Sequence, residues 1–138
     1  AYPNRLATYH VPLYPSFRSP DSQPSKQLRD DWLGVFAEYN LTVSFENHDH
    51  TYKRTKLLRN NEVCDLDSTT NDNTTCTLFM GDGAWGVTPR SSIKHRWYLE
   101  NTKGINHIMR VDVGTTYMNI TVIDKEGEVF DSTVKHFL

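Results

Sequence analysis

The sequence lacks any long hydrophobic run, and no stretch approaches the roughly 20 apolar residues that a membrane-spanning helix needs. It also lacks an excess of charge of one sign, because the formal net charge is -2 at pH 7. This near-balance gives no electrostatic reason to expect nucleic acid or an anionic membrane as a partner. The residues from Ala1 to Arg5 contain no hydrophobic stretch of a signal peptide. We therefore expect that any export signal was removed or lies outside this sequence.

Cysteine is scarce, and the only two, Cys64 and Cys76, flank a polar stretch. An even pair in this position predicts a disulfide bond. Three N-x-S/T sequons begin at Asn40, Asn73 and Asn119, which makes these residues candidate glycosylation sites. Chance is the alternative explanation of the sequons, since Asn and Thr are abundant. Together the cysteines and the sequons favour a secreted, extracellular or lumenal protein.

Hydrophobic residues make up 37% of the sequence, which fits a single globular domain over residues 1–138. The apolar pattern predicts, in chain order, a strand at Arg5–Tyr9, a loop at His10–Pro20, a helix at about Pro24–Tyr39, a strand at Leu41–Phe45, a polar excursion at Asn60–Thr75, a strand at Thr77–Met80, a turn at Gly81–Gly86, and strands at Arg96–Leu99, His107–Val113, Tyr117–Ile123 and Val129–Val134. Asp124–Gly127 joins the last two strands as a hairpin turn.

The predicted helix has one apolar face and one polar face. The apolar face comprises Leu28, Trp32, Val35, Phe36 and Tyr39, and the polar side comprises Lys26, Arg29, Asp30 and Glu38. The order of elements predicts an α/β layer that continues into an antiparallel sheet. Because one helix cannot cover both faces of such a sheet, we expect another polypeptide to cover an apolar face that includes Leu6, Val43, Phe45, Leu78 and Phe79.

Two histidines follow the second predicted strand, His48 and His50. In extended backbone, residues two apart point the same way, so the two imidazoles are expected to project together. Imidazole is a common ligand of zinc, iron and related ions. His10 ends the preceding strand, and a strand–helix–strand crossover brings the ends of both strands side by side. The residues alone leave two interpretations of His10 open, a metal ligand and a capped core histidine.

The segments T-Y-H-V-P-L-Y-P-S (residues 8–16) and V-S-F-E-N-H-D-H-T-Y-K-R (residues 43–54) resemble the last two metal motifs of purple acid phosphatases. Those motifs read approximately H-x-P-x-Y and G-H-x-H-x-Y-x-R. The turn Gly81-Asp82-Gly83 and the strands from His107 onward also match the family, so the resemblance covers nearly the whole chain. It implies an α/β fold, namely the C-terminal half of a four-layer α/β/β/α metallophosphoesterase (calcineurin-like) sandwich that ends in antiparallel strands.

The resemblance also implies two metal ions, one of them iron and the other zinc, manganese or iron. His10 and His48 would share the divalent ion, and His50 would bind the iron-like ion. Such centres hydrolyse phosphate esters by fixing the phosphate and lowering the pKa of a bound water. The family's earlier motifs, which supply the remaining ligands, are absent here. The resemblance therefore implies that the N-terminal part of the protein, as a separate chain or a missing segment, completes the site.

Two further departures from the family concern individual residues. Asn47 stands where the family usually has glycine, whose freedom permits unusual backbone angles. The loop after His10 lacks the histidines that family members often place near the substrate, and Arg18 in that loop either binds phosphate or lies solvated on the surface. His107 is a candidate for the rim of the substrate pocket. Lys53 and Arg54 are expected on a solvated face, with anion steering as the alternative.

Two functional hypotheses follow. The first is a metal-dependent phosphatase or phosphodiesterase, of which this chain is the C-terminal part. The second is a non-catalytic secreted glycoprotein of the same fold that binds metal or phosphate, or that has a structural or interaction role. Asn47 and the loop without histidine favour the second hypothesis, whereas His10, His48 and His50 favour the first.

Overall fold

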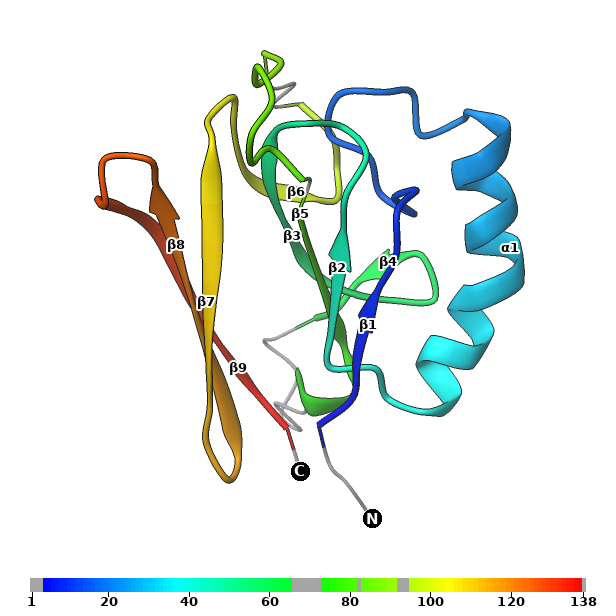
Figure 1. The fold of residues 1–138 in the computed structure, drawn as a ribbon. Coiled ribbons are helices and arrows are strands. Elements are labelled where there is room, and N and C mark those ends of the chain that lie inside the picture. The colour runs from blue at the N-terminus through cyan, green and yellow to red at the C-terminus, as the bar shows by residue number, and fades with distance from the viewer. Residues whose placement is uncertain (1–3, 66–72, 82, 92–94, 138) are drawn as a thin grey trace.

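A computed structural model describes residues 4–65, 73–81, 83–91 and 95–137 (Figure 1). The elements in chain order are β1 (Leu6–Thr8), α1 (Gln23–Glu38), β2 (Val43–Glu46), β3 (Tyr52–Arg59), β4 (Glu62–Val63), the short 3-10 helix η1 (Asn73–Thr75), β5 (Thr77–Gly81), β6 (Leu99–Lys103), β7 (His107–Val113), β8 (Tyr117–Asp124) and β9 (Val129–His136). No helix in the described ranges is both long enough and apolar enough to cross a membrane.

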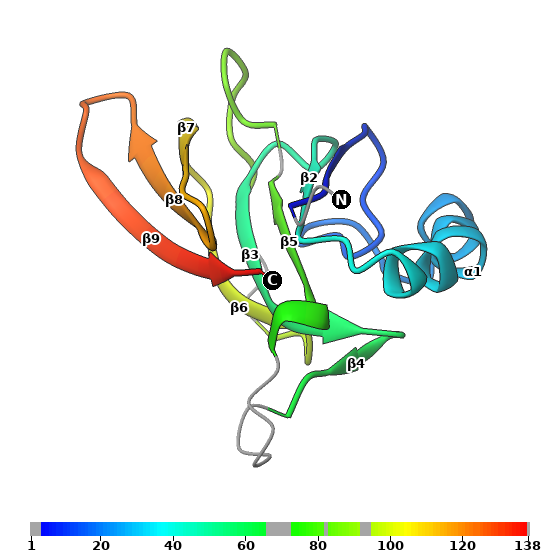
Figure 2. The ribbon, with the colours of Figure 1, turned by 90° about the horizontal axis from the view of Figure 1, so that it is seen from below.

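These elements form three layers, a helix, a larger sheet and a smaller sheet (Figures 1 and 2). The larger sheet has the order β1-β2-β5-β3-β4, with β6 paired to β3. Its first three strands run parallel, and β3 is antiparallel to β5. The smaller sheet is the antiparallel meander β7-β8-β9. The predicted α/β order and the crossover from β1 through α1 to β2 are therefore confirmed.

Helix α1 begins at Gln23, where the next residue, Pro24, has the backbone angle that the first helical turn requires. It ends because Asn40 adopts a positive φ of 48°, and the amide of Leu41 then donates to the carbonyl of Phe36 at 2.9 Å. Asparagine tolerates this left-handed conformation better than most residues do, which makes it an effective helix stop.

The buried stripe of α1 differs from the predicted one. Leu28, Trp32 and Phe36 pack on the core together with Leu33, whereas Val35 and Tyr39 are exposed. The prediction that Arg29 lies on the polar side is also wrong, because its guanidinium donates to the carbonyls of Leu13 and Pro20. The loop before the helix supplies these carbonyls, so one turn of α1 faces the loop and not solvent.

The smaller sheet covers the face of the larger sheet that we expected another polypeptide to cover. Val43 and Leu78 lie in one core cluster with Met118, Ile120 and Val122 of β8. Phe79 points to the opposite face and is buried on the helix side. The expectation of an uncovered face is thus wrong for Val43, Leu78 and Phe79, whereas Phe45 is half-buried and Leu6 is 49% exposed. The reason is that the C-terminal strands fold back as a separate sheet instead of extending the first one.

Strand β3 was not expected from the sequence, and β6 begins at Leu99, where the prediction ended a strand. The prediction of a solvated Lys53 and Arg54 is also wrong. Lys53 is fully buried and paired with Glu46, and Arg54 is paired with Asp131 of β9 at 2.9 Å. Successive residues of a strand point to opposite faces, so Lys53 serves the helix side and Arg54 the smaller sheet.

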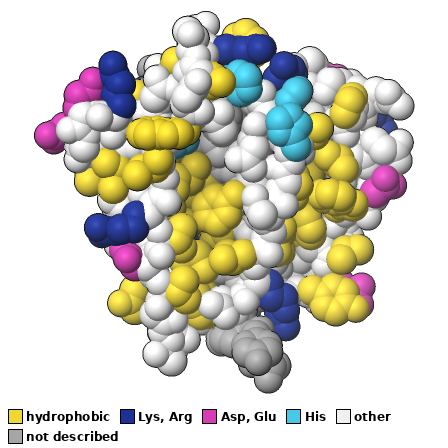
Figure 3. All heavy atoms as spheres, in the orientation of Figure 1, with side chains coloured by type: hydrophobic (Ala, Val, Ile, Leu, Met, Phe, Trp, Pro, Cys, Tyr) yellow, Lys and Arg dark blue, Asp and Glu magenta, His cyan; other side chains and the backbone are white. Residues whose placement is uncertain are grey.

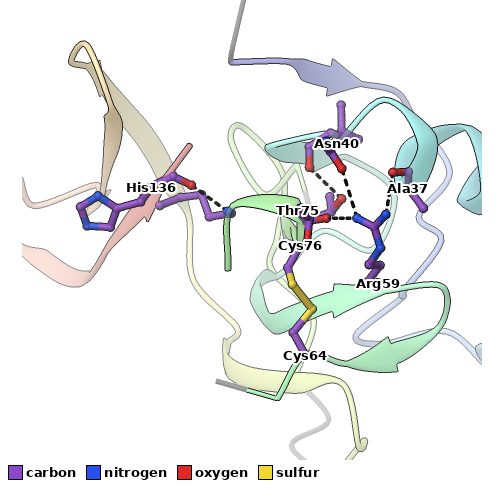
Figure 4. The surroundings of a disulfide bond; sticks show 10 residues. Ala37, Asn40, Arg59, Cys64, Thr75, Cys76 and His136 are labelled. Atoms are coloured by element: carbon purple, nitrogen blue, oxygen red, sulfur yellow. Dashed lines mark hydrogen bonds between the residues drawn. A yellow bond between two sulfur atoms is a disulfide. The ribbon is translucent and has the colours of Figure 1, made fainter. Parts of the chain in front are cut away.

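A disulfide bond joins Cys64 and Cys76, as predicted (Figure 4). Next to it, Arg59 donates to the carbonyls of Thr75 and Ala37 and to the side-chain oxygen of Asn40. Arg59 therefore ties the disulfide-bonded segment to the end of α1.

The three sequons stay predictions of glycosylation. Asn40 and Asn119 are half-buried, and the side chain of Asn73 lies outside the described residues, as do residues 66–72 of the polar excursion and Asp82 of the turn.

The two sheets are joined by a polar link in which Tyr52 and Arg54 of β3 both donate to Asp131. Burial acts to raise the pKa of Asp131, but the hydrogen bonds from Arg54 and Tyr52 outweigh it and lower the pKa. A carboxylate with a depressed pKa stabilises the fold above its unfolded-state pKa, and this contribution is lost as the pH falls through the lower folded-state pKa.

We predict that Asp131→Asn lowers the free energy of unfolding by about 1.5–3 kcal/mol at pH 7, the range for hydrogen bonds to a charged group. The difference from the wild type should shrink as the pH falls below the ordinary aspartate value of 3.8. Urea unfolding at pH 7 and at pH 3 measures both quantities. Asp112→Asn is the control, because its ion pair with Arg110 is exposed and should contribute little. An equal loss at both pH values would contradict the role of the Asp131 charge.

Candidate metal-binding site

His10 and His48 meet at the ends of two neighbouring parallel strands. The register pairs Thr8 of β1 with Phe45 of β2, so the chain leaves both strands at the same level. Nε2 of His10 lies 2.8 Å from Nδ1 of His48, and the ring centroids are 4.7 Å apart. The imidazole of His10 is exposed and that of His48 is partly exposed. The crossover therefore brings two nitrogen donors together at an accessible point, as the sequence predicted.

Asn47 fixes the backbone at the end of β1 relative to the backbone at the end of β2, and so the relative position of His10 and His48. Its backbone amide donates to the carbonyl of His10 at 3.1 Å, and its side-chain amide donates to the carbonyl of Tyr9 at 2.8 Å. It is not among the described residues with a positive φ, so the replacement of the family's glycine needs no unusual backbone angle. The small residue that matters here is Gly83, where an added Cβ would lie 2.7 Å from the carbonyl oxygen of Asn47.

His50 does not project from an extended strand, which corrects the reasoning that paired it with His48. Strand β2 ends at Glu46, and residues 48–51 form bends. His50 adopts a positive φ of 55°, and its carbonyl accepts a hydrogen bond from the amide of Arg90 at 2.9 Å. The two histidines are therefore joined by a turn and not by extended backbone, and the binding of a metal by His50 stays a prediction.

Asp49, which the sequence analysis did not single out, holds the loop that follows His10. Its buried carboxylate accepts from the amides of Phe17 and Arg18 at 2.7 and 3.2 Å and pairs with the Arg18 guanidinium at 3.1 Å. Burial acts to raise the pKa of Asp49, but these hydrogen bonds lower it overall. Arg18 also donates to the carbonyl of His48. Arg18 is therefore not a freely solvated side chain. Its side chain keeps 34% exposure, and its contact with phosphate stays a prediction.

Glu46 is a second buried carboxylate that sequence reasoning missed. It is fully buried, pairs with Lys53, and accepts hydrogen bonds from the Tyr9 hydroxyl at 2.8 Å and the Leu13 amide at 2.7 Å. Burial and the nearby Glu46 carboxylate raise the pKa of the Tyr9 phenol, which keeps it a donor. Lys53 also donates to the carbonyl of Tyr14. No sequence signal marked these residues, because a glutamate and a lysine in a strand usually lie at the surface.

The histidine pair fits one metal ion. Burial lowers the pKa of His48, and the charges of Arg18 and His10 lower it further, which favours the neutral form that binds metals. Two ligand nitrogens at about 2.0–2.1 Å from a tetrahedral zinc lie roughly 3.3 Å apart, so the pair would need to open only slightly. Within the described residues, no three His, Cys, Asp or Glu side chains group closely enough to hold a metal. The pair alone is therefore an incomplete ligand set.

His107 lines a cavity of about 320 Å³ whose other walls include Asn47, Phe45, Gly83, Trp85 and Met109. Its ring is buried against Tyr52 and Phe130, and its Nδ1 lies 3.0 Å from the carbonyl oxygen of Ile105. Burial lowers the pKa of His107. Its predicted place at the rim of a substrate pocket stays a prediction.

Comparison with known proteins bears on this arrangement. No protein-family model and no curated protein sequence matches the chain. Among solved structures, a purple acid phosphatase, PPD1, isolated from yellow lupin (Lupinus luteus) seeds, is similar with a TM-score of 0.71 and 13% sequence identity. The match covers 94% of this chain and 24% of the lupin chain.

This chain therefore has a purple-acid-phosphatase-like fold. It corresponds to the C-terminal part of that fold, which confirms the predicted fold class. The described residues supply its layers as α/β/β. At 13% identity the likeness concerns the fold, and it spans about a quarter of the lupin enzyme.

We predict that Asp49→Ala destabilises the protein by about 2–3 kcal/mol, because the amides of Phe17 and Arg18 lose a buried acceptor and the exposed part of Arg18 softens the loss. Urea unfolding at pH 7 measures this difference. Asp30→Ala is the matched control, since its ion pair with Lys26 is exposed and should contribute about 0.5 kcal/mol or less. Equal effects of the two substitutions would show that Asp49 does not hold the loop.

Proposed function

We propose that this chain is part of a metal-dependent phosphatase or phosphodiesterase and supplies His10, His48 and His50 to a dinuclear metal centre. The observation that carries this proposal is the contact between Nε2 of His10 and Nδ1 of His48, at the ends of adjacent parallel strands in a purple-acid-phosphatase-like fold. In this structure the two nitrogens lie within hydrogen-bond distance of each other, and the same two nitrogens would serve as ligands of one metal ion.

In the proposed centre, His10 and His48 bind one divalent ion, which is zinc, manganese or iron. His50, in a turn with a positive φ, binds the second ion, which is iron. The metals would supply the polarisation of the phosphate and the lowered pKa of a bound water. The residues of this chain would bind the metals and orient the ligands. Asn47 fixes the ends of the two strands relative to each other, and Arg18 donates a hydrogen bond to the carbonyl of His48. Arg18 and His107 are the proposed contacts to a phosphate-ester substrate.

The proposed centre needs more ligands than the described residues group together, so we propose that the N-terminal part of the protein supplies them. Two features support this partner. Each sheet leaves one edge strand open on the same side of the described molecule, β1 in the larger sheet and β7 in the smaller (Figures 1 and 2). Between β7 and β2, the neighbour of β1, lies the cavity of about 320 Å³ with apolar walls that include Phe45, Met109 and Val111.

The surface on this side is also apolar beyond the cavity. Leu6, Ile108 and Val113 are each exposed by about half, at 49%, 48% and 52%. In Figure 3, histidine side chains gather at the top of this face, above a broad band of hydrophobic side chains. Open strand edges beside apolar surface favour pairing with further strands. A partner docked here would reach the histidines at the upper end of the band.

One observation supports the second candidate function, a non-catalytic protein of the same fold. Because no three potential ligands group within the described ranges, a non-catalytic glycoprotein that binds a single metal or a phosphate remains the alternative. The disulfide bond and the sequons support a secreted or lumenal location for either function.

We predict that His10→Ala and His48→Ala each weaken zinc binding by at least about tenfold and lower the hydrolysis of an aryl phosphate in parallel, because each removes one ligand. Equilibrium dialysis against a zinc chelator and a colorimetric phosphatase assay measure the two quantities. His136→Ala is the matched control, since His136 is an exposed histidine at the end of β9. Zinc binding without hydrolysis in the wild type would favour the non-catalytic alternative, and unchanged zinc binding in both variants would remove the metal site.

The partner proposal has a separate test. Residues 1–138 expressed alone should unfold at a lower temperature than the same residues within the whole protein, because the open edges and the apolar cavity stay in water. Burial of apolar surface contributes about 25 cal/mol per Å², so several hundred Å² left open amounts to several kcal/mol. Calorimetry of both samples, with and without zinc, measures the difference. Equal, cooperative unfolding of the isolated chain and of the whole protein would contradict the partner proposal.

A further inference from the structure

The loop that carries His10 is held from below by one side chain. Oε1 of Glu46 accepts hydrogen bonds from the Tyr9 hydroxyl at 2.8 Å and from the Leu13 amide at 2.7 Å. Tyr9 immediately precedes His10 in the chain, and Leu13 follows three residues later. A single oxygen atom thus holds the side chain of the residue before this histidine and the backbone of the loop after it.

The same residue leads directly into the other histidine. Glu46 is the last residue of β2, two positions before His48. Its backbone position is fixed by the pairing of β2 with β5, where an added Cβ on Gly81 would lie 2.2 Å from the Glu46 carbonyl oxygen. The carboxylate therefore connects the loop of one histidine to the strand of the other.

The charge of this carboxylate is balanced internally. Glu46 and Lys53 both have 0% exposure, and Nζ of Lys53 donates to Oε2 of Glu46 and to the carbonyl of Tyr14. Oε2 thus faces the lysine, while Oε1 is left to hold the loop. A buried ion pair contributes little net stability compared with an apolar pair of similar size. Stability alone therefore does not account for a buried glutamate at this place.

We propose that Glu46 is a positioning residue, which sets the separation of the His10 and His48 nitrogens through Oε1 and so tunes the affinity of the site for a divalent ion. This inference rests on the proposed metal-binding function. Glu46 does not touch the metal in this arrangement; it acts through Tyr9 and Leu13. The role of Lys53 is to neutralise Glu46, so that the carboxylate can remain buried beneath the site.

A matched pair of double substitutions separates positioning from charge and stability. Glu46→Gln/Lys53→Met removes both charges but keeps an amide oxygen in place of Oε1. Glu46→Leu/Lys53→Met removes both charges and the acceptor. Both variants lose the same lysine contact to Tyr14, so they differ only in the hydrogen bonds to Tyr9 and Leu13.

The measurement is zinc affinity of the whole protein by chelator competition, together with the visible spectrum of bound cobalt, which reports coordination geometry. Glu46→Gln/Lys53→Met should bind zinc within about twofold of the wild type. Glu46→Leu/Lys53→Met should bind zinc about 10–100-fold more weakly, the loss typical of residues that orient metal ligands, and its cobalt spectrum should change. Equal zinc affinity of the two variants, whether both are weakened or neither, would overturn the inference.

Should Glu46→Leu/Lys53→Met fail to fold, Tyr9→Phe replaces it. This change removes one of the two donors to Oε1, together with the acceptor of the Ser44 hydroxyl. It leaves the ring packed against Trp32, whose centroid lies 5.0 Å away. It should weaken zinc binding by at least about threefold, a loss of about 0.65 kcal/mol, and unchanged affinity would overturn the inference. Failure of the proposed function looks different, because His10→Ala and His48→Ala would then leave zinc affinity unchanged whatever Glu46 does.

Discussion

The parallel pairing of β1 with β2 is the constraint on which the site depends. The pairing aligns Leu6 with Val43 and Thr8 with Phe45, and a slip of one residue would exchange the faces of all their side chains. Only three residues of β1 take part, too few to fix the register by backbone hydrogen bonds alone. The register is therefore secured beyond the strand ends, where Asn47 binds the carbonyls of Tyr9 and His10.

Two buried carboxylates extend this control over the loop between His10 and Pro20. Glu46 holds its start through Tyr9 and Leu13, and Asp49 holds its later part through Phe17 and Arg18. Both come from the short segment that carries His48. The proline-rich loop has no regular structure of its own, so its shape is determined by acceptors that another segment provides. The positions of His10 and His48 relative to each other are consequently fixed by the same set of hydrogen bonds.

The sequence predicted the parts of this arrangement that depend on local pattern. Helix α1, the strands β1, β2, β5 and β7 to β9, and the meeting of His10 with His48 follow from apolar spacing and from the rules of strand–helix–strand crossovers. Strand β3 was missed because Lys53 and Arg54 conceal its apolar residues. Their acidic partners lie 7 and 77 residues away, and no local pattern indicates such distances. The turn at His50 was missed for a related reason, since a positive φ in a histidine leaves no trace in composition.

The sequence also did not predict that the C-terminal strands β7 to β9 fold back onto the larger sheet. The sequence predicted a strand at β8, but not that its buried residues would pack on Val43 and Leu78. Only tertiary structure determines whether a set of antiparallel strands extends an existing sheet or lies on top of it.

Strand β3 has a consequence for how the protein tolerates sequence change. Tyr52 and Arg54 bind the smaller sheet through Asp131, while Lys53 between them binds the loop side through Glu46. Most strands at a core boundary keep one face on which substitutions are nearly neutral. Here three consecutive side chains form hydrogen bonds or ion pairs with partners on opposite faces of the strand, and these interactions depend on direction as well as distance. Sequence changes in this strand would have to be compensated at distant positions, Glu46 on one face and Asp131 on the other. The strand therefore couples the variation of the loop that carries His10 to that of the smaller sheet.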